Sequence, residues 1–171
     1  GAEFVVRLPL TAEALAPAPS QAPPDAALRA RDLAAAQRRV IVVEDDADAR
    51  EMLVELLGKL GFEARAAPDG ERGLELAAEA APGLMLVDLD LPGINGFEVA
   101  RRVRALPGAD AVVLVALTGF GQPEERSRAL RVGFDEHLLK PLDLARLRQV
   151  LERCSNDSAR VRPSAEGRKT S

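Results

Sequence analysis

The sequence predicts an α/β domain in which a parallel five-stranded sheet carries helices on both faces. Short apolar runs at 40–43, 84–87 and 111–117 suit strands that are buried on both faces. Amphipathic stretches, with apolar side chains at helical spacing, lie between these runs. Strict alternation of strands and helices is typical of a parallel sheet covered by its crossover helices. Ligands of such sheets bind beyond the carboxyl ends of the strands.

The individual elements follow from local patterns. After the first strand, apolar side chains between Met52 and Leu60 fall on one face of a helix, and Gly61 is a natural stop. A weaker strand is expected at 62–66. Gly133 is expected to end the fourth helix, because glycine readily adopts the left-handed backbone of a helix end. The remaining helices are expected at 68–80, 96–106, 123–132 and 143–153, and the last strand at 134–139.

Composition excludes several classes of function. The 171 residues are 47% hydrophobic and carry a net charge of −4, which argues against a surface built for nucleic acid. A single cysteine, Cys154, excludes an internal disulfide, and a single histidine, His137, leaves no second imidazole for a zinc site. No stretch approaches the roughly 18 consecutive apolar residues of a membrane span. The first residues lack the pattern of a signal peptide.

Composition also divides the chain into segments. Residues 1–36 carry five of the twelve prolines among many alanines, and residues 11–37 are predicted to form a linker. Residues 38–153 hold nearly all of the periodic apolar pattern and form the predicted domain. Residues 154–171 are polar, with hardly an apolar side chain, so a disordered tail is predicted there.

Reactive side chains stand where the predicted strands end. The acidic run Glu44-Asp45-Asp46 follows the first strand and Asp88 follows the third. Thr118 ends the fourth strand, and Lys140 follows the fifth. A parallel sheet brings these ends to one edge, and converging carboxylates favour a hard divalent cation such as Mg²⁺. The alternative for the acidic run alone is that it caps the helix that follows.

Four segments together resemble the receiver domain of bacterial two-component response regulators. They are VIVVEDD at 40–46, LMLVDLDLPGINGFEV at 84–99, VALTGFG at 115–121 and GFDEHLLKPLD at 133–143. The resemblance covers about residues 38–153 and all five strands. It implies a flavodoxin-like sheet with the strand order 2-1-3-4-5. It also implies a phosphoacceptor that takes a phosphoryl group from a phosphohistidine and then changes conformation.

The resemblance assigns roles to the residues at the strand ends. Asp88 matches the phosphoacceptor, and Lys140 matches the lysine that pairs with the phosphoryl group. Asp45 and Asp88 match carboxylates that bind Mg²⁺ directly, and Glu44 matches a neighbour that acts through water. The backbone carbonyl of Asp90 matches the remaining protein ligand. A carboxylate suits this chemistry because its oxygen can attack phosphorus to form an acyl phosphate.

Two further residues match the conformational switch of the family. Thr118 matches the hydroxyl that moves toward the bound phosphoryl group, and His137 matches the aromatic residue that turns inward behind it. An imidazole titrates near pH 7, so a switch at His137 is predicted to depend on pH. The alternative is that His137 simply rests on the surface of the sheet. The resemblance also implies a cis peptide bond between Lys140 and Pro141.

The first ten residues, GAEFVVRLPL, resemble the closing strand of the ATP-binding domain of sensor histidine kinases. A hybrid histidine kinase is the context that this implies, and a start added by cloning is the alternative. With no glycine-rich ATP lid and its one histidine inside the receiver, the chain is expected not to be a kinase by itself. The expected partner is a histidine kinase or a histidine phosphotransfer protein. A cytoplasmic location is expected, without nucleic-acid or membrane contact, and a homodimer is left open.

Two other functions fit parts of the pattern. Asp88-Leu89-Asp90 fits the DxD motif of haloacid dehalogenase-type phosphatases, in which the first aspartate is the nucleophile and the second serves as acid and base. That family places the motif on its first strand, whereas here an acidic run follows an earlier strand. A degenerate receiver that only binds partners is the other alternative. The complete set of Glu44, Asp45, Asp88, Thr118 and Lys140 weighs against it.

Overall fold

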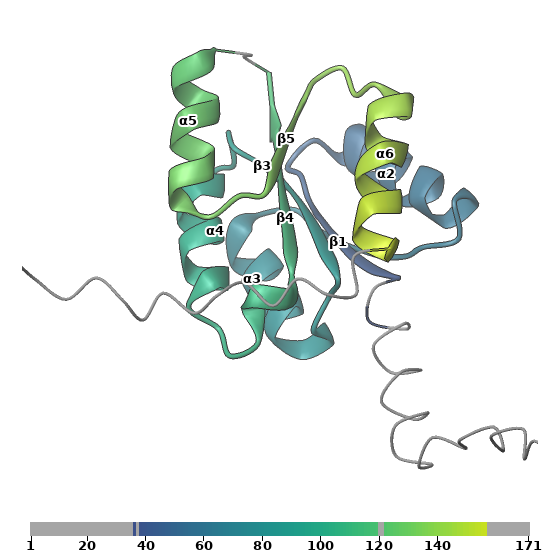
Figure 1. Ribbon diagram of the computed structural model, residues 1–171, viewed down its shortest axis with the longest axis horizontal. Helices are drawn as coiled ribbons and strands as arrows, with labels where there is room; N and C mark the ends of the chain where they lie inside the picture. The colour runs from purple at the N-terminus through teal and green to yellow at the C-terminus, as the bar shows by residue number, and fades with distance from the viewer. Residues whose placement is uncertain (1–35, 37, 120–121, 157–171) are drawn as a thin grey trace, which may run out of the picture.

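The computed structural model describes residues 36, 38–119 and 122–156, with side chains up to residue 153. A parallel sheet of five strands in the order β2-β1-β3-β4-β5 lies between two layers of helices (Figure 1), so the predicted fold and strand order are confirmed. The strands are β1 (Arg39–Val43), β2 (Glu63–Ala67), β3 (Leu84–Asp88), β4 (Val113–Thr118) and β5 (Glu136–Leu139).

Polar side chains begin three of the described helices. Asp46, Asp69 and Asn95 each accept a hydrogen bond from a backbone amide three residues later, which satisfies a donor that the helix itself leaves unpaired. Gly61 and Gly133 follow two of the helices with positive φ angles of 83° and 114°, as predicted for helix ends. The helices are α2 (Ala47–Lys59), α3 (Gly70–Ala80), α4 (Gly96–Arg104), the 3₁₀ turn η1 (Ala109–Ala111), α5 (Pro123–Val132) and α6 (Leu144–Asn156).

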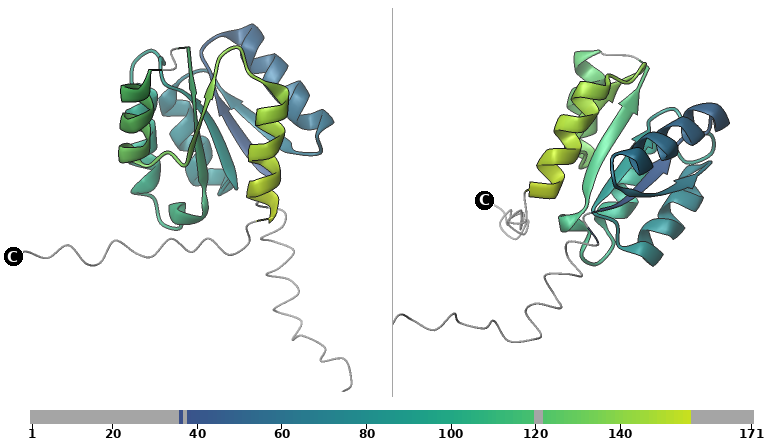
Figure 2. Two further views of the ribbon diagram at one scale, coloured as in Figure 1. Left: turned by 45° about the horizontal axis from the view of Figure 1, so that its top comes forward. Right: turned by 90° about the vertical axis from the view of Figure 1, so that its right-hand side faces the viewer.

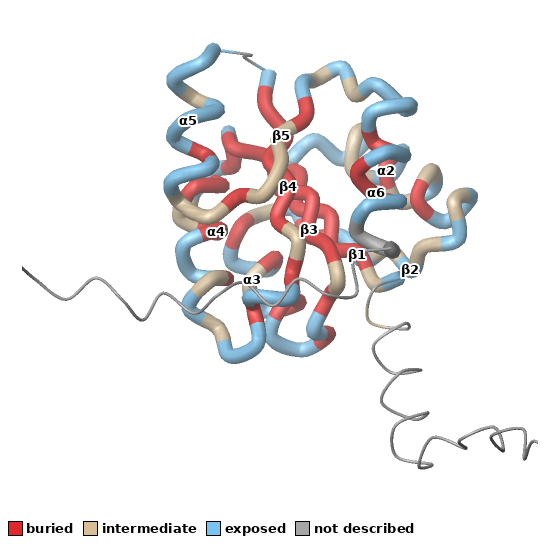
Figure 3. The backbone as a smooth tube through the Cα atoms, in the orientation of Figure 1, coloured by how far each residue is buried: buried red, intermediate tan, exposed pale blue. Residues whose placement is uncertain are grey.

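Alternating side chains of the strands build one hydrophobic core on each face of the sheet. Ile41 and Val43 point toward α3, α4 and α5, whereas Val40 and Val42 point toward α2 and α6. Two views of the fold show the helices on opposite sides of the sheet (Figure 2). The buried part of the chain follows β1, β3 and β4 through the centre (Figure 3), which explains why these strands read as continuous apolar runs.

Several predicted boundaries are wrong by a few residues, each for a local reason. The helix predicted at 68–80 begins at Gly70, because Asp69 is its cap. The strand predicted at 111–117 begins at Val113, since the preceding residues form the turn η1. Phe134 lies outside β5 because its amide still donates to the carbonyl of Ala129 in α5.

The predicted segments at the two ends of the chain fall largely outside the described residues. Helix α6 continues to Asn156, so residues 154–156 of the predicted tail are helical. Residues 1–10, and residues 11–37 apart from Ala36, are not among the described residues, and neither are residues 157–171. Within the part of the chain that is described, no helix has the length and apolar character needed to cross a bilayer.

A buried ion pair fastens the edge of the sheet at which the strands begin. Arg104 of α4 reaches Asp135, the residue before β5, with 2.6 Å between Nη2 and Oδ2, and both side chains are nearly buried. The same guanidinium donates to the carbonyls of Gly133, Ala109 and Val112, and Asp135 accepts from the amide of Leu114. These bonds satisfy the buried charges of Arg104 and Asp135. The reactive side chains lie at the opposite edge of the sheet.

Helix α4 approaches the end of β3 so closely that its first residue has no room for a side chain. A Cβ atom on Gly96 would lie 2.3 Å from the carbonyl oxygen of Asp88 and 2.9 Å from the Cα of Leu89. The amide of Gly96 donates to the carbonyl of Leu89 across this contact. Glycine at this position therefore sets the distance between α4 and Asp88.

Gly96→Ala should lower the free energy of unfolding by about 1–3 kcal/mol, because the added methyl group meets backbone that cannot move aside. Gly58→Ala is the matched control, because nothing lies within 4 Å of its added Cβ and alanine favours the helix α2 by up to about 1 kcal/mol. Urea unfolding followed by far-ultraviolet circular dichroism measures both. Equal effects of the two substitutions would contradict the close approach.

Candidate functional site

Four strands deliver their carboxyl ends to the same edge of the sheet. In the register of the sheet, Asp88 of β3 lies beside Leu117 of β4, and Thr118 lies beside Leu139 of β5. Strand β1 runs parallel beside β3 and ends just before the acidic run. The predicted site residues that meet at this edge are Glu44, Asp45, Asp88, Thr118 and Lys140.

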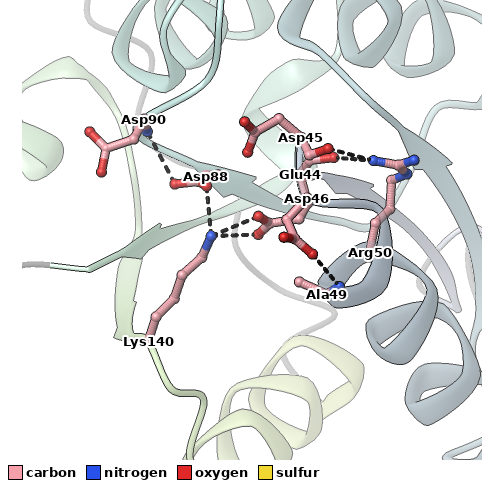
Figure 4. Close-up of polar contacts among 8 residues, drawn as sticks. All are labelled: Glu44, Asp45, Asp46, Ala49, Arg50, Asp88, Asp90 and Lys140. Atoms are coloured by element: carbon pink, nitrogen blue, oxygen red, sulfur yellow. Dashed lines mark hydrogen bonds and ion pairs between the residues drawn. The ribbon is translucent and has the colours of Figure 1, made fainter.

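The ammonium group of Lys140 lies between two buried carboxylates. Its Nζ atom is 2.6 Å from Oδ2 of Asp88, and it is 2.8 Å and 2.7 Å from Oε1 and Oε2 of Glu44 (Figure 4). Burial alone would lower the pKa of Lys140, but the hydrogen bonds to Asp88 and Glu44 outweigh it and raise that pKa above its usual value. Lys140 is therefore firmly protonated and neutralises part of the negative charge.

Glu44 is the most deeply buried acid of the site. Its side chain is 1% exposed, and burial raises its pKa, while the hydrogen bond from Lys140 acts in the opposite direction. Its Oε2 atom lies within ion-pair distance of Lys140 but receives no hydrogen bond of acceptable geometry. A buried carboxylate oxygen thus keeps unused capacity to accept a bond.

The donor set fits a hard cation. Oxygen atoms from Glu44, Asp45 and Asp88 all lie within 4.8 Å of one another. Three carboxylates face the single ammonium of Lys140, so the ionised cluster carries an excess of negative charge. Clustered carboxylate oxygens without nitrogen or sulfur donors are the ligands that Mg²⁺ prefers.

Both oxygens of the Asp88 carboxylate are occupied. Oδ2 contacts Lys140, and Oδ1 accepts a hydrogen bond of 3.1 Å from the backbone amide of Asp90. The carboxylate of Asp90 itself is exposed and points away from Asp88 (Figure 4). Asp90 therefore acts on Asp88 through its backbone, and its side chain is poorly placed for proton transfer there.

The three acids of the run after β1 have three different environments. Asp46 is the N-cap of α2, with its Oδ1 atom 2.8 Å from the amide of Ala49, so the capping alternative holds for this residue. Glu44 is buried beside Lys140, whereas Asp45 is exposed at the mouth of the site. Arg50 donates to the backbone carbonyls of Glu44 and Asp45, at 2.8 Å and 3.1 Å, and holds the loop in place.

The hydroxyl of Thr118 makes a contact that the sequence analysis did not anticipate. Thr118 is 2% exposed, and its Oγ1 atom donates to Oε2 of Glu125 in the first turn of α5, at 2.7 Å. Glu125 is half-buried. The signal available in the sequence was an acid in the first turn of a helix that begins with proline, seven residues after Thr118.

His137 lies within β5, three residues before Lys140. His137 is half-buried within the strand, where it pairs with Ala116 of β4. Its position is intermediate between the two alternatives, since the ring is neither fully exposed nor fully inside. The peptide bond between Lys140 and Pro141 is cis, as predicted. Arg50 and Gly96 are further residues that support the site and that the sequence analysis missed.

Comparison with known proteins identifies the family. The model of the response regulator receiver domain matches residues 40–152, which is most of the described chain. An uncharacterised 14.6 kDa protein of Leptolyngbya boryana is 38% identical over 70% of this chain and 92% of its own length. The sensor histidine kinase AtsR of Burkholderia thailandensis is 35% identical over 90% of this chain, but the match spans only 25% of AtsR.

Some relatives are longer proteins. The DNA-binding response regulator MtrA of Mycolicibacterium paratuberculosis is 36% identical over 73% of this chain, and the chain spans about half of it, 56%. The sequence of this chain is therefore comparable with one domain of such proteins.

Solved structures agree with the fold. The chemotaxis protein CheY4 of Vibrio cholerae has a TM-score of 0.65 at 28% identity, over 68% of this chain and 97% of that one. The receiver domain of Ssk1 of Saccharomyces cerevisiae, solved with the histidine phosphotransfer protein Ypd1, has a TM-score of 0.66 at 25% identity, over 72% of this chain and 92% of that one. The sheet order, the match over residues 40–152 and these relatives together show that the chain belongs to the family of response regulator receiver domains, the phosphoacceptor modules of two-component signalling.

Proposed function

We propose that Asp88 is the residue that accepts the phosphoryl group. The observation that carries the proposal is the placement of Asp88 at the end of β3, with one oxygen on Lys140 and the other on the amide of Asp90. The side chain is nearly buried, at 6% exposure, yet it belongs to an acidic cluster that opens to solvent through Asp45. A nucleophile held in one orientation at an accessible edge is what phosphoryl transfer requires.

The transfer we propose is a displacement at phosphorus. A carboxylate oxygen of Asp88 forms a P–O bond while the P–N bond of the donor phosphohistidine breaks, and the leaving imidazole takes up a proton from solvent. The product on this chain is an acyl phosphate. Lys140 lies 2.6 Å from Asp88 and is positioned to meet the negative charge that spreads over the phosphoryl oxygens. The amide of Asp90 holds the carboxylate during the attack.

We propose Mg²⁺ as the cofactor, held by Asp45 and Asp88, with Glu44 acting through water and Asp90 through its backbone carbonyl. The excess of negative charge in this cluster of carboxylate oxygens supports the assignment. When bound, the ion supplies positive charge that stabilises the transferring phosphoryl group.

The phosphatase alternative receives no support from the site. It requires the second aspartate of the DxD motif to exchange a proton next to the nucleophile. The carboxylate of Asp90 instead points away from Asp88 (Figure 4), and the motif stands on β3 rather than on the first strand. The clustered acids Glu44, Asp45 and Asp88, two of which contact Lys140, argue equally against a receiver that has lost its chemistry.

The context we infer is a hybrid sensor histidine kinase. The match to AtsR extends over 90% of this chain, beyond the residues of the receiver model, which supports such a context for the segments around residues 38–153. The partner we propose is a histidine kinase or a histidine phosphotransfer protein, as Ypd1 is for the receiver of Ssk1. Cytoplasmic location and the absence of direct nucleic-acid and membrane contact stay predictions, and a homodimer stays open.

We propose that Thr118 and His137 form the switch. Burial lowers the pKa of His137, and Arg126 of α5 and Arg146 of α6 lower it further, while Glu136 acts in the opposite direction. The imidazole is therefore mainly neutral at pH 7. A neutral ring can enter an apolar space without the penalty that an imidazolium would meet there. We therefore expect the switch to weaken as the pH falls, because protonation of His137 hinders the inward turn of its ring.

Exposure to a small-molecule phosphodonor with Mg²⁺ should add one phosphoryl group per chain, because Asp88 is the one carboxylate clamped by Lys140 and a backbone amide within the site. Asp88→Asn should abolish the addition. Asp90→Asn is the matched control, since it removes an exposed carboxylate nearby but keeps the backbone. Intact mass spectrometry measures the product. Undiminished labelling of Asp88→Asn would overturn the assignment.

Asp45→Ala should weaken Mg²⁺ binding by at least about tenfold, since losing even the groups that support metal ligands weakens binding about 10- to 100-fold. Asp46→Ser is the control, because serine removes the neighbouring charge and still caps α2. Isothermal titration calorimetry with Mg²⁺ measures both affinities. If Asp46→Ser weakens binding as much as Asp45→Ala does, the role of Asp45 reduces to its charge.

The chain contains a single histidine, so NMR follows one imidazole without overlap. We expect His137 to titrate below 6.5, and Arg126→Gln to move its pKa upward, while Arg131→Gln in the same helix leaves it in place. The unfolded chain takes up the proton first as the pH falls through about 6.5, so the free energy of unfolding should decrease below that pH. The free energy of unfolding of His137→Phe should not show this decrease. A His137 pKa at or above 6.5 would contradict the prediction.

A further inference from the structure

Thr118 is placed at the site by β4, but its hydroxyl is held elsewhere. The backbone is fixed next to Lys140, whose amide donates to the carbonyl of Thr118 at 2.8 Å. The side chain is buried, and its Oγ1 atom donates to the Glu125 carboxylate of α5 at 2.7 Å. This distance is typical of a strong hydrogen bond to an ionised acceptor. A polar contact of this kind ties the acceptor edge of the sheet to the first turn of α5.

We infer that Glu125 is a positioning residue, which holds the Thr118 hydroxyl away from Asp88 until Asp88 carries a phosphoryl group. The inference rests on the proposed function of Asp88 and adds the group that opposes the switch. A hydroxyl has one proton and donates one strong hydrogen bond at a time. The Glu125 carboxylate and a phosphoryl oxygen therefore compete for the same donor, and binding by one weakens binding by the other.

The move that this competition needs is small. Three staggered positions are available to a threonine side chain, so rotation about its Cα–Cβ bond redirects the hydroxyl while the backbone stays paired in the sheet. On the other side, α5 is anchored by Ala129, which is 1% exposed one turn beyond Glu125. Release of Thr118 leaves the Glu125 carboxylate at the start of α5, where Glu124 and Arg126 are exposed. Phosphorylation thereby leaves the Glu125 carboxylate at this helix end without its hydrogen bond from Thr118.

The test measures how tightly the site binds beryllofluoride, a phosphoryl mimic, in the presence of Mg²⁺. The chain has no tryptophan or tyrosine for fluorescence, so amide NMR signals of the site follow the titration. Glu125→Gln should tighten binding roughly threefold to thirtyfold, since it replaces a charged acceptor by a neutral one. Glu125→Ala should tighten it further. Glu124→Gln, an exposed acid in the same turn, should leave it unchanged.

A second measurement separates positioning from a structural role. In a Thr118→Val background, which lacks the hydroxyl, Glu125→Gln should no longer change the affinity for beryllofluoride. An effect that persists in this background, or an equal effect of Glu124→Gln, overturns the inference. Failure of the proposed function itself would show in the comparison of the wild-type chain with Asp88→Asn. If the wild-type chain binds beryllofluoride no better than Asp88→Asn does, the site is not a phosphoacceptor and the role of Glu125 falls with it.

Discussion

The structure at the acceptor edge depends on one ammonium group placed between two buried carboxylates. Lys140 contacts Glu44 after β1 and Asp88 at the end of β3, so it connects three strands that lie far apart in the sequence. Removing one partner from such a group leaves a buried charge uncompensated, which is strongly destabilising. The contact also has a directional effect, because it turns one oxygen of Asp88 toward Lys140 and leaves the other to the amide of Asp90. Charge balance and orientation of the nucleophile thus come from the same contact.

Depth below the surface gives three consecutive acids different properties. Burial raises the pKa of Glu44, Asp45 lies exposed at the mouth, and Asp46 is committed to the end of α2. The alternation of side chains along a strand ends at Val43, and Arg50 holds the carbonyls of the following loop. Because the backbone is fixed in this way, each acid keeps its own environment. The excess negative charge is therefore concentrated where a cation can approach from solvent.

The fold was predictable because its signals are repeated in every unit. Continuous apolar runs, such as that of β3, and a glycine after a helix, such as Gly133, are local signals. The convergence of Glu44, Asp88 and Lys140 followed from parallel topology alone, which needs no side-chain detail. The contact of Thr118 with Glu125 was not predictable, because it depends on how α5 is tilted against β4 and on a side-chain rotamer. The same holds for Arg104, whose partners become neighbours only when α4 packs against η1 and β5.

The charges of the site explain how the proposed phosphorylation of Asp88 can reach α5. An acyl phosphate replaces the single negative charge of Asp88 by about 1.5 to 2 negative charges on the phosphoryl group. Lys140 is already shared with Glu44, so the added charge increases the demand for hydrogen-bond donors at this edge. Thr118 follows Leu117, the residue of β4 that lies beside Asp88, and its proton is engaged by Glu125. The demand for a donor at Asp88 is therefore transmitted to α5 as the loss of a hydrogen bond there, and the sheet itself does not need to change.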